Sequence, residues 1–356
     1  MKEIQYRIFS LRTHKKNLRI KRSNVCQFEL TFRCPLYCRH CYTGCYNQPA
    51  YFKEELKTQE VKTILDKVYQ AGVIWLCLTG GDPLARADFL EIYSYAKQKG
   101  FIVSVFTSGY LLDKKIVKFL KSKPPFVIEL TLNAVTEQLY EKISGVKGSF
   151  LRLMKGINLL IKERIPLKIK TQVTKDNLEE LTKIKKLVEG LGLEFRPSHI
   201  LYPRLNGDKT PCNLRISPKE ILGLDADDRR LSACDDWRLQ DSNPHPPTVN
   251  LFTCAIGGGD GFHIDPLGNI FLCNLMRKTD FNLLKTDLGY ALDGLISQVR
   301  EKSFLTDSAC RDCSLKRLCN WCPGRAYLEK DKEEEPIEYY CELARLQRMI
   351  EKKTDV

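Results

Sequence analysis

The chain has 356 residues, of which 43% are hydrophobic and 28% are charged, and its formal net charge is +13. This composition is typical of a soluble globular protein. No apolar run approaches the ~20 residues needed to span a bilayer, and residues 1–5 lack the apolar core of a signal peptide. We therefore predict a cytoplasmic protein with no membrane contact, long enough for a barrel plus a smaller module.

The cysteine count and the charge balance indicate what the chain binds. Fifteen cysteines in a reducing cytosol are better explained by metal or cluster ligation than by disulfides. The basic balance favours an acidic or anionic partner, such as an acidic peptide segment. Nucleic acid fits poorly, because the lysines are spread over predicted helices such as 114–123, where a solvated face is the usual explanation.

Short apolar strands alternate with helical patterns from residue 25 to about residue 200. The predicted strands are Val25–Thr31, Val73–Thr79, Phe101–Thr107, Phe126–Leu132, Leu167–Val173 and Leu193–Ser198. The predicted helices are Thr58–Ala71, Asp88–Lys99, Asp113–Leu120, Ser149–Glu163 and Asn177–Glu189, with Thr58, Asp88, Asp113 and Asn177 as N-caps. Strand–helix repetition predicts βαβ units and a parallel sheet, and six such units predict an α/β fold with a partial (β/α)6 barrel.

Parallel barrels carry their chemistry on the loops that follow the strands. The first strand is followed by a cysteine-rich loop, the second by Gly80-Gly81-Asp82-Pro83, and the third by Ser108-Gly109 directly after Thr107. Asn133 ends the fourth strand. We therefore expect these four segments to lie on one rim of the barrel.

The chain divides into five predicted segments. Residues 203–250 are rich in Pro, Asp, Asn and Arg, so we interpret them as a bridge that shapes the mouth of the site. The predicted boundaries are 1–24 for an N-terminal segment, 25–202 for the barrel, 203–250 for the bridge, 251–346 for a small cysteine-rich iron–sulfur domain and 347–356 for a tail.

Cys34, Cys38 and Cys41 form a C-x3-C-x2-C motif on the first loop. Thiolates at short spacings hold iron–sulfur clusters. A cubane has four irons, so three cysteines leave one iron open, as a catalytic zinc keeps one open position. A structural zinc knuckle with Cys45 as the fourth ligand is the alternative interpretation of the motif alone.

The motif, with His40 before its last cysteine, resembles the signature of the radical S-adenosylmethionine (SAM) superfamily. The resemblance implies a 4Fe–4S cluster whose open iron binds SAM. It also implies reductive cleavage of SAM to a 5′-deoxyadenosyl radical that abstracts hydrogen from a substrate, and an electron donor such as flavodoxin or ferredoxin.

A second group of cysteines lies in the C-terminal third. Its members are Cys254, Cys273, Cys310, Cys313, Cys319, Cys322 and Cys341. Such density predicts a small module held together by metal rather than by apolar burial. A zinc-ribbon-like module is the bland alternative.

This pattern resembles the SPASM extension of peptide-modifying radical SAM maturases, although the gap between Cys319 and Cys322 is one residue shorter than is usual there. The resemblance implies two auxiliary 4Fe–4S clusters. The distal cluster would be ligated by Cys310, Cys313, Cys319 and Cys341, and the nearer one by Cys254, Cys273 and Cys322. The fourth position of the nearer cluster stays open between an open iron, Asp260, Cys212 and Cys234.

Gly80, Gly81 and Asp82 resemble the superfamily's GGE-type motif, with Asp in the place of Glu. The resemblance implies that the backbone and Asp82 accept hydrogen bonds from the SAM ammonium, which has only donors to offer. Further candidates for contacts to SAM are His40, Tyr42, Thr107, Ser108 and Asn133. Strand-end capping is as good an explanation for Thr107, Ser108 and Asn133, and core packing for the two aromatic residues.

Other polar residues are weaker candidates. Gln172 and Arg196 lie near the ends of the last two predicted strands and could contact a ligand. We interpret Cys26, Cys45 and Cys77 as structural thiols, and His199, His245 and His263 as ordinary polar contacts. The sequence names no catalytic hydrogen donor or base.

The family resemblance implies modification of a ribosomally made peptide or protein by crosslinking, thioether formation, epimerisation or oxidation. The substrate could carry an acidic or cysteine-containing segment. Sulfatase maturation is disfavoured, because Asn274 stands where those enzymes place a basic Asp. Cofactor maturation, in a haem-variant, tetrapyrrole, tungsten or molybdenum pathway, is the second hypothesis. A non-catalytic iron–sulfur or zinc protein for electron transfer is the third.

Overall fold

The computed structural model describes residues 5–20, 23–227, 250–252, 254 and 261–354. Its centre is an eight-stranded sheet in the order β6-β5-β4-β3-β2-β1-β7-β8. Neighbouring strands from β6 to β7 run parallel, and only the β7–β8 pair is antiparallel. The strands are β1 (Val25–Glu29), β2 (Trp75–Thr79), β3 (Ile102–Thr107), β4 (Val127–Thr131), β5 (Leu167–Gln172), β6 (Glu194–Ser198), β7 (Gly261–Ile264) and β8 (Ile270–Phe271).

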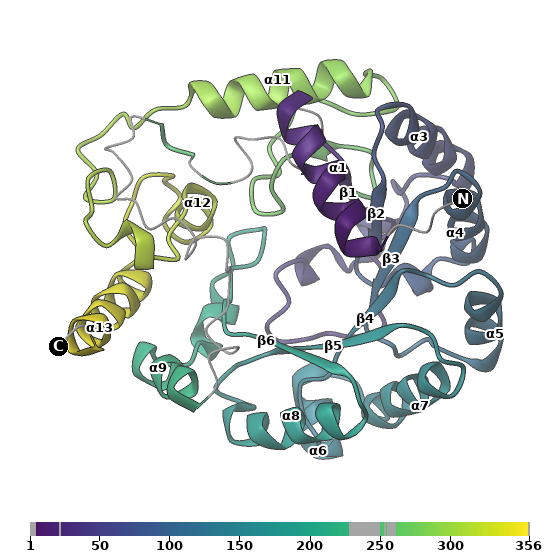
Figure 1. Cartoon of the computed structure of the whole chain (residues 1–356), viewed down its shortest axis with the longest axis horizontal. Coiled ribbons are helices and arrows are strands. Elements are labelled where there is room, and N and C mark those ends of the chain that lie inside the picture. The colour runs from purple at the N-terminus through teal and green to yellow at the C-terminus, as the bar shows by residue number, and fades with distance from the viewer. Residues whose placement is uncertain (1–4, 21–22, 228–249, 253, 255–260, 355–356) are drawn as a thin grey trace.

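Helices form the outer layer of a curved, open barrel (Figure 1). Those of the barrel are α2 (Pro49–Phe52), α3 (Thr58–Gln70), α4 (Phe89–Gln98), α5 (Lys114–Ser122), α6 (Glu137–Ser144), α7 (Ser149–Lys162) and α8 (Leu181–Gly190). The others are α1 (Tyr6–Ile20), α9 (Pro218–Asp227), α11 (Leu288–Glu301), α12 (Pro323–Lys330) and α13 (Glu338–Thr354). The predicted α/β partial barrel with a cysteine-rich C-terminal region is confirmed.

The main hydrophobic core lies between the sheet and the outer helices. Strand side chains alternate between two faces, and on β3 Val103 and Val105 are buried in this core. Among the alternate residues of β4 and β5, Glu129, Lys168 and Lys170 lie on the opposite face and are charged. The inside of the barrel is therefore partly polar.

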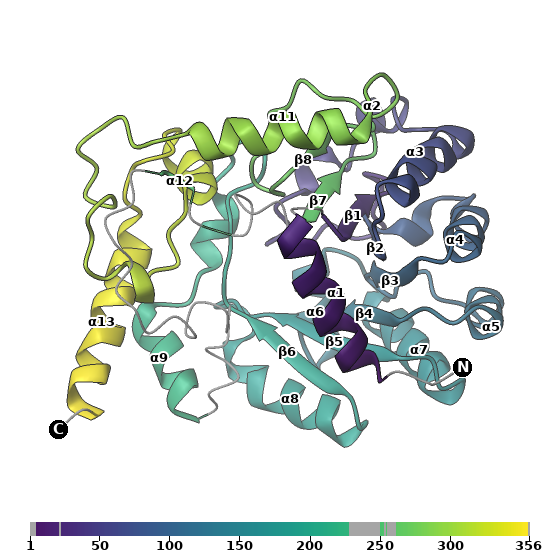
Figure 2. The ribbon, with the colours of Figure 1, turned by 45° about the horizontal axis from the view of Figure 1, so that its top comes forward.

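Helix α1 lies across the end of the barrel opposite the loops that follow the strands (Figure 2). The phenol of Tyr6 accepts a hydrogen bond from Trp75 Nε1 at 3.0 Å, and its ring packs on Phe126. Trp75 begins β2, and Phe126 directly precedes β4. The sequence analysis missed this helix. It also missed α6, which is only eight residues long.

Two predicted helix starts differ from the structure. The helix expected from Asn177 begins at Leu181 after a 3-10 turn, Leu178–Glu180. The side chain of Asn177 is used elsewhere, because it accepts from Thr174 N at 2.7 Å and donates to Asn133 O at 2.9 Å. Helix α3 is capped one residue before Thr58, where Lys57 N donates to Glu60 at 2.7 Å. Asp113 caps α5 as predicted.

The C-terminal region extends the barrel. Strand β7 pairs in parallel with β1, so that Val25 lies opposite Gly261. Helix α11 packs Leu288, Ala291 and Leu295 into the same core as the barrel helices. The sheet and its core therefore run across residue 251, the predicted start of the second domain. Within the described residues, none of the helices has the length and apolarity of a membrane span.

Candidate functional site

The cysteine motif lies on the loop between β1 and a 3-10 turn at Gly44–Tyr46. Asn47 closes this loop, since its Oδ1 accepts from Cys34 N at 3.1 Å and its Nδ2 donates to Cys34 O at 2.9 Å. The C-terminal end of α6 supports the outer edge of the loop, because Tyr37 N donates to Ser144 O at 2.8 Å. The loop is thus held from both sides by backbone and amide hydrogen bonds.

The three thiols of the motif interact with one another. Burial raises the pKa of Cys34 above its usual range, and the Asp82 carboxylate and the thiols of Cys38 and Cys41 raise it further. Burial also raises the pKa of Cys38 to about 12. Thiols in such surroundings stay protonated unless a positive charge is supplied. The iron of a cluster supplies that charge, so the donor set fits the predicted group.

The glycines after β2 have a structural function that the sequence analysis did not foresee. A Cβ atom on Gly80, whose φ is +143°, would lie 2.4 Å from Thr31 O, and one on Gly81 would lie 2.5 Å from Phe32 O. Gly81 N donates to Thr31 O at 2.7 Å. The two glycines let this loop pack directly against the start of the cysteine loop.

Asp82, Thr107 and Ser108 form one buried hydrogen-bonded group that joins the loops after β2 and β3. Asp82 is fully buried, and its carboxylate accepts from Thr107 Oγ1 at 2.8 Å, Ser108 Oγ at 2.5 Å, Ser108 N at 3.0 Å and Leu84 N at 3.1 Å. Burial raises the pKa of Asp82, and these hydrogen bonds oppose the rise. The carboxylate is thus satisfied by protein donors, and it positions the two loops.

Asn133 lies at the same rim and is also used in the scaffold. Its Oδ1 accepts from Gln172 N at 2.9 Å, and its carbonyl accepts from Asn177. Gln172 donates to Ser198 O at 2.7 Å, which ties β5 to the end of β6. Arg196 pairs with Glu194. The structure brings the predicted rim segments together, but these polar groups already have protein partners.

His40 differs from them, because its Nδ1 is buried and has no hydrogen-bond partner. Burial, and to a smaller extent Arg204, lowers the pKa of His40 to about 4. Tyr42 packs edge-on against Tyr202, with ring centroids 6.0 Å apart. An unsatisfied nitrogen beside the cysteine loop fits the binding of a polar ligand there.

The sequence analysis missed Arg204, whose side chain binds the backbone of the cysteine loop. Its Nη1 donates to Cys41 O at 3.0 Å and its Nε to Asp208 at 3.0 Å. Leu205 N donates to Tyr42 O at 2.9 Å. The bridge segment therefore contacts the motif from 163 residues away, and local sequence offers no signal for such a contact.

Replacing Arg204 with Met is expected to weaken retention of the cluster about 10–100-fold, as loss of outer-shell support does at metal sites. The measurement is the rate at which a ferrous chelator abolishes SAM cleavage. Arg196→Met, which removes an arginine paired with Glu194 on β6, is the control. Equal chelation rates in the two variants would contradict this role of Arg204.

The C-terminal thiols influence one another's pKa in two sets. Burial raises the pKa of Cys273 to about 11, with Cys322 and Cys254 among the further causes. Burial raises the pKa of Cys310 to about 12, with further contributions from Cys341, Cys319 and Cys313. In the part of the chain that the structure describes, no three Cys, His, Asp or Glu side chains are arranged to hold a single metal ion. A four-iron cluster is wider than one ion, so its ligands stand further apart.

Of the three candidate side chains for the nearer cluster's fourth ligand, only Cys212 lies in the described residues. Cys234 and Asp260 lie outside the described residues. Cys212 has Arg215 and Glu329 among its electrostatic neighbours, and burial raises its pKa to about 11.

Cys26 is fully buried in the core, as expected. Cys77 instead faces the inside of the barrel, since Lys170 and Glu129 influence its pKa.

Comparison with known proteins identifies the site. Residues 28–188, which include the cysteine motif and the GGDP loop, match the family described as the Radical SAM superfamily. Residues 28–188 therefore form a radical SAM domain of an enzyme. Members of this superfamily use a 4Fe–4S cluster and SAM, which together supply a carbon radical able to abstract hydrogen.

The similarity to known proteins covers most of the chain for some relatives and about half of it for others. An AdoMet-dependent heme synthase of Methanosarcina barkeri is 27% identical over 340 residues, which cover 88% of this chain and 95% of that protein. A PqqA peptide cyclase of Granulibacter bethesdensis is 29% identical over 164 residues, covering 46% of this chain and 43% of the cyclase. SuiB of Streptococcus suis shares the fold, with a TM-score of 0.69 at 16% identity, covering 93% of this chain and 81% of SuiB.

Strands β7 and β8 and the residues that follow them up to Arg277 form a hairpin, here called the C-terminal hairpin. An ion pair joins this hairpin to the barrel. Arg277, four residues after Cys273, donates to both carboxylate oxygens of Glu29, at 2.8 and 2.5 Å. Glu29 ends β1, and the side chains of Glu29 and Arg277 are 5% and 12% exposed. Both residues influence the pKa of Tyr42, which is raised mainly by burial. The pair therefore fixes the hairpin against the start of the cysteine loop.

Two histidines of the enzyme are not the ordinary polar contacts that we predicted. His199 follows β6, is buried, and has an Nε2 without a hydrogen-bond partner. His263 on β7 stacks on Phe271, and its Nδ1 is also buried without a partner. Burial lowers the pKa of each to about 4, and a nearby arginine adds to the effect. His245 lies outside the described residues.

His199 should make the enzyme less stable in mild acid. The unfolded chain takes up a proton below the ordinary histidine pKa of about 6.5, whereas folded His199 does so only near pH 4. The free energy of unfolding therefore falls as the pH drops from 6.5 toward 4, by about 2 kcal/mol between pH 7 and 5. Anaerobic urea unfolding should show this loss reduced in His199→Gln. An equal loss in both proteins would contradict the assignment.

Proposed function

We propose that the enzyme abstracts hydrogen from a side chain of a carboxylated tetrapyrrole during haem-type cofactor maturation. The observation that carries this proposal is the extent of the similarity. The resemblance to the heme synthase covers 95% of that protein, including its C-terminal part, whereas the resemblance to the peptide cyclase covers 43%. The proposal promotes the second of the two enzyme hypotheses drawn from the sequence.

The inner face of the barrel supports an anionic substrate. Lys168 and Lys170 alternate along β5 with Ile169, which is buried on the helix side. Lys170 pairs with Glu129, and its Nζ lies 3.9 Å from the centroid of Phe106. Lys168 Nζ lies 2.7 Å from Glu194. Cations beside an aromatic ring suit a flat, apolar macrocycle that carries carboxylates.

We also propose the residues that hold the cofactors. Cys34, Cys38 and Cys41 would hold the SAM-binding cluster, with His40 and Tyr42 beside SAM. Gly80, Gly81, Asp82, Thr107, Ser108 and Asn133 would shape the SAM site mainly by ordering its loops, because the polar side chains among them already have protein partners. The auxiliary clusters would use the two C-terminal thiol groups.

The test is an anaerobic reaction of the cluster-loaded enzyme with SAM, a reductant and an iron tetrapyrrole bearing propionate side chains. We expect 5′-deoxyadenosine together with a tetrapyrrole of altered mass. Lys170→Met should weaken tetrapyrrole binding, followed by absorbance, while SAM binding is retained. Deoxyadenosine formation that is indifferent to the tetrapyrrole, with unchanged tetrapyrrole recovered, would overturn the proposal.

A second candidate is peptide modification. It is favoured by the similarity to PqqA peptide cyclases over part of the chain and by the shared fold with SuiB, which has been solved with its precursor peptide SuiA. The same reaction with the peptide encoded nearest the gene distinguishes the two. A peptide lighter by two hydrogens, with no change in the tetrapyrrole, would establish this candidate instead. Both candidates require an electron donor such as flavodoxin or ferredoxin.

A further inference from the structure

Three arginines are buried among the described residues, and two of them have a carboxylate partner. Arg86 pairs with Asp88, and Arg215 pairs with Glu329. Arg325 on α12 is only 8% exposed, yet among the described residues no carboxylate pairs with it. A buried charge without a counter-charge is costly, so Arg325 requires an explanation.

The partners that Arg325 does have are neutral. Its Nη1 donates to the carbonyl of Asn320, and its Nη2 lies 3.4 Å from the phenol of Tyr202. The guanidinium stacks on the rings of Tyr202 and Tyr340, at 5.4 and 5.5 Å from their centroids. Its Nε is buried with no acceptor. A buried guanidinium N–H without an acceptor in the protein suits a negatively charged group beside it.

The chain around Arg325 indicates where that anion lies. Cys322, three residues earlier, interacts electrostatically with Arg325, and Cys322 belongs to the same thiol group as Cys273 and Cys254. Asn320 and Tyr340 directly adjoin Cys319 and Cys341 of the other group. The guanidinium thus lies within electrostatic range of a thiol of the nearer group, and clusters held by thiolates are negatively charged.

We propose that Arg325 is the counter-charge of the nearer auxiliary cluster and raises its reduction potential. A fixed cation in a low-dielectric site favours the more negative, reduced form of a neighbouring redox centre. The same guanidinium is thereby relieved of its desolvation cost. Arg325 acts on the cluster and not on the substrate, so it is a positioning and tuning residue rather than a catalytic one.

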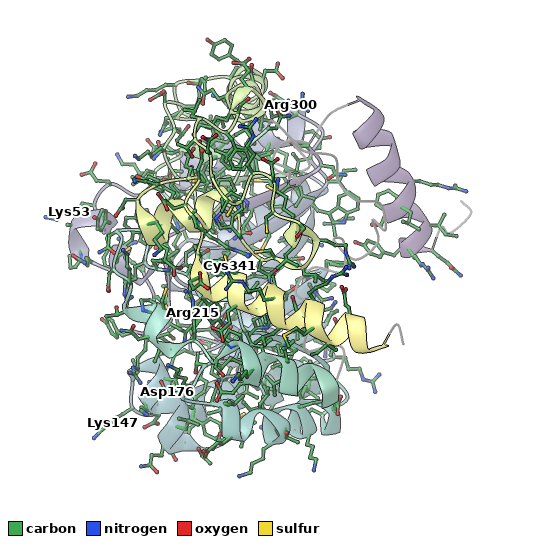
Figure 3. All side chains as sticks on the ribbon, turned by 90° about the vertical axis from the view of Figure 1, so that its left-hand side faces the viewer. Lys53, Lys147, Asp176, Arg215, Arg300 and Cys341 are labelled. Carbon is green, nitrogen blue, oxygen red and sulfur yellow. The ribbon has the colours of Figure 1, made fainter. Side chains whose placement is uncertain are left out.

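The test is a potentiometric titration of the auxiliary clusters by electron paramagnetic resonance, in full-length enzyme whose SAM-binding cluster is removed by Cys38→Ala. Arg325→Gln should reduce the equilibrium constant for reduction of one auxiliary cluster at least tenfold. For a one-electron couple this is a fall in reduction potential of about 59 mV. Arg325→Lys should stay near the parent value. Lys147→Gln is the control, because Lys147 is an exposed cation in the turn before α7 and lies away from Cys341 and the C-terminal region (Figure 3).

Each outcome bears on the proposal. Unchanged potentials in an Arg325→Gln protein with full iron content would overturn it. If Arg325→Gln cannot hold the auxiliary iron, the Lys variant decides: retention of iron by Arg325→Lys supports a need for positive charge. Loss of iron from both variants, with an unchanged circular dichroism spectrum, would mean that Arg325 acts through packing, and would also overturn the proposal.

Discussion

Cys38→Ser is expected to abolish SAM cleavage, with deoxyadenosine formation falling to the uncatalysed background, a loss on the order of 10⁶-fold or more. The thiol lies in the middle of the motif, and its pKa of about 12 is raised by burial and by Cys41. A serine hydroxyl at that position cannot replace a thiolate ligand for iron. The measurement is deoxyadenosine by liquid chromatography, alongside iron content.

Cys45→Ser is the matched control for that experiment. Cys45 is a buried thiol on the same loop, and its Sγ lies 3.9 Å from Tyr42 O. The cluster assignment predicts that this variant retains iron and SAM cleavage. A zinc knuckle would need Cys45 as its fourth ligand, so equal loss in the two variants, with zinc in the parent protein, would contradict the cluster assignment.

Arg277→Met is expected to destabilise the enzyme by about 3–5 kcal/mol, because it leaves the Glu29 carboxylate buried without a partner. The pair is a side-chain link between the C-terminal hairpin and β1, at 2.5 Å, in addition to the backbone pairing of β7 with β1. Anaerobic denaturant unfolding measures the change. The variant should also lose auxiliary iron more readily, since the hairpin carries Cys273.

The double variant Glu29→Gln/Arg277→Met tests the reason for that loss. Removing both charges should recover most of the stability, because the penalty comes from the unpaired carboxylate. The pair Lys121–Glu163, also at 2.5 Å but with Lys121 largely exposed, is the control. Lys121→Met should cost under about 1 kcal/mol. A double variant no more stable than Arg277→Met would contradict the explanation.

Much of the barrel was predictable because its signals are local. Apolar runs of strand length alternate with helical periodicity, and all six predicted strands are present with boundaries shifted by a few residues. The two thiol-rich regions are visible in the sequence as well, because their short cysteine spacings are local, and their roles as ligands stay predictions. The errors lie where tertiary contacts override local signals: Asn177 serves Asn133 and Thr174 rather than a helix start.

The SAM site shows the same division. The sequence indicated which segments meet at the rim, because parallel strands bring their following loops together. It could not assign partners within the rim. Asp82 binds Thr107 and Ser108 rather than standing free, and Gly80 is required by its contact with Thr31 O. Both depend on the spacing between neighbouring strands, which no local pattern records.

The sequence by itself determined the chemistry of this protein: a three-cysteine motif on a βα loop, a second thiol-rich region, and six strand–helix units. Only the tertiary structure decided how these parts are joined. Strand β7 pairs with β1, Arg204 and Arg277 reach the cysteine loop and its strand from far along the chain, and Arg325 is buried near Cys322. The reason is physical: ligand chemistry depends on residue type and close spacing, whereas buried charges and strand pairing depend on which distant segments exclude water together.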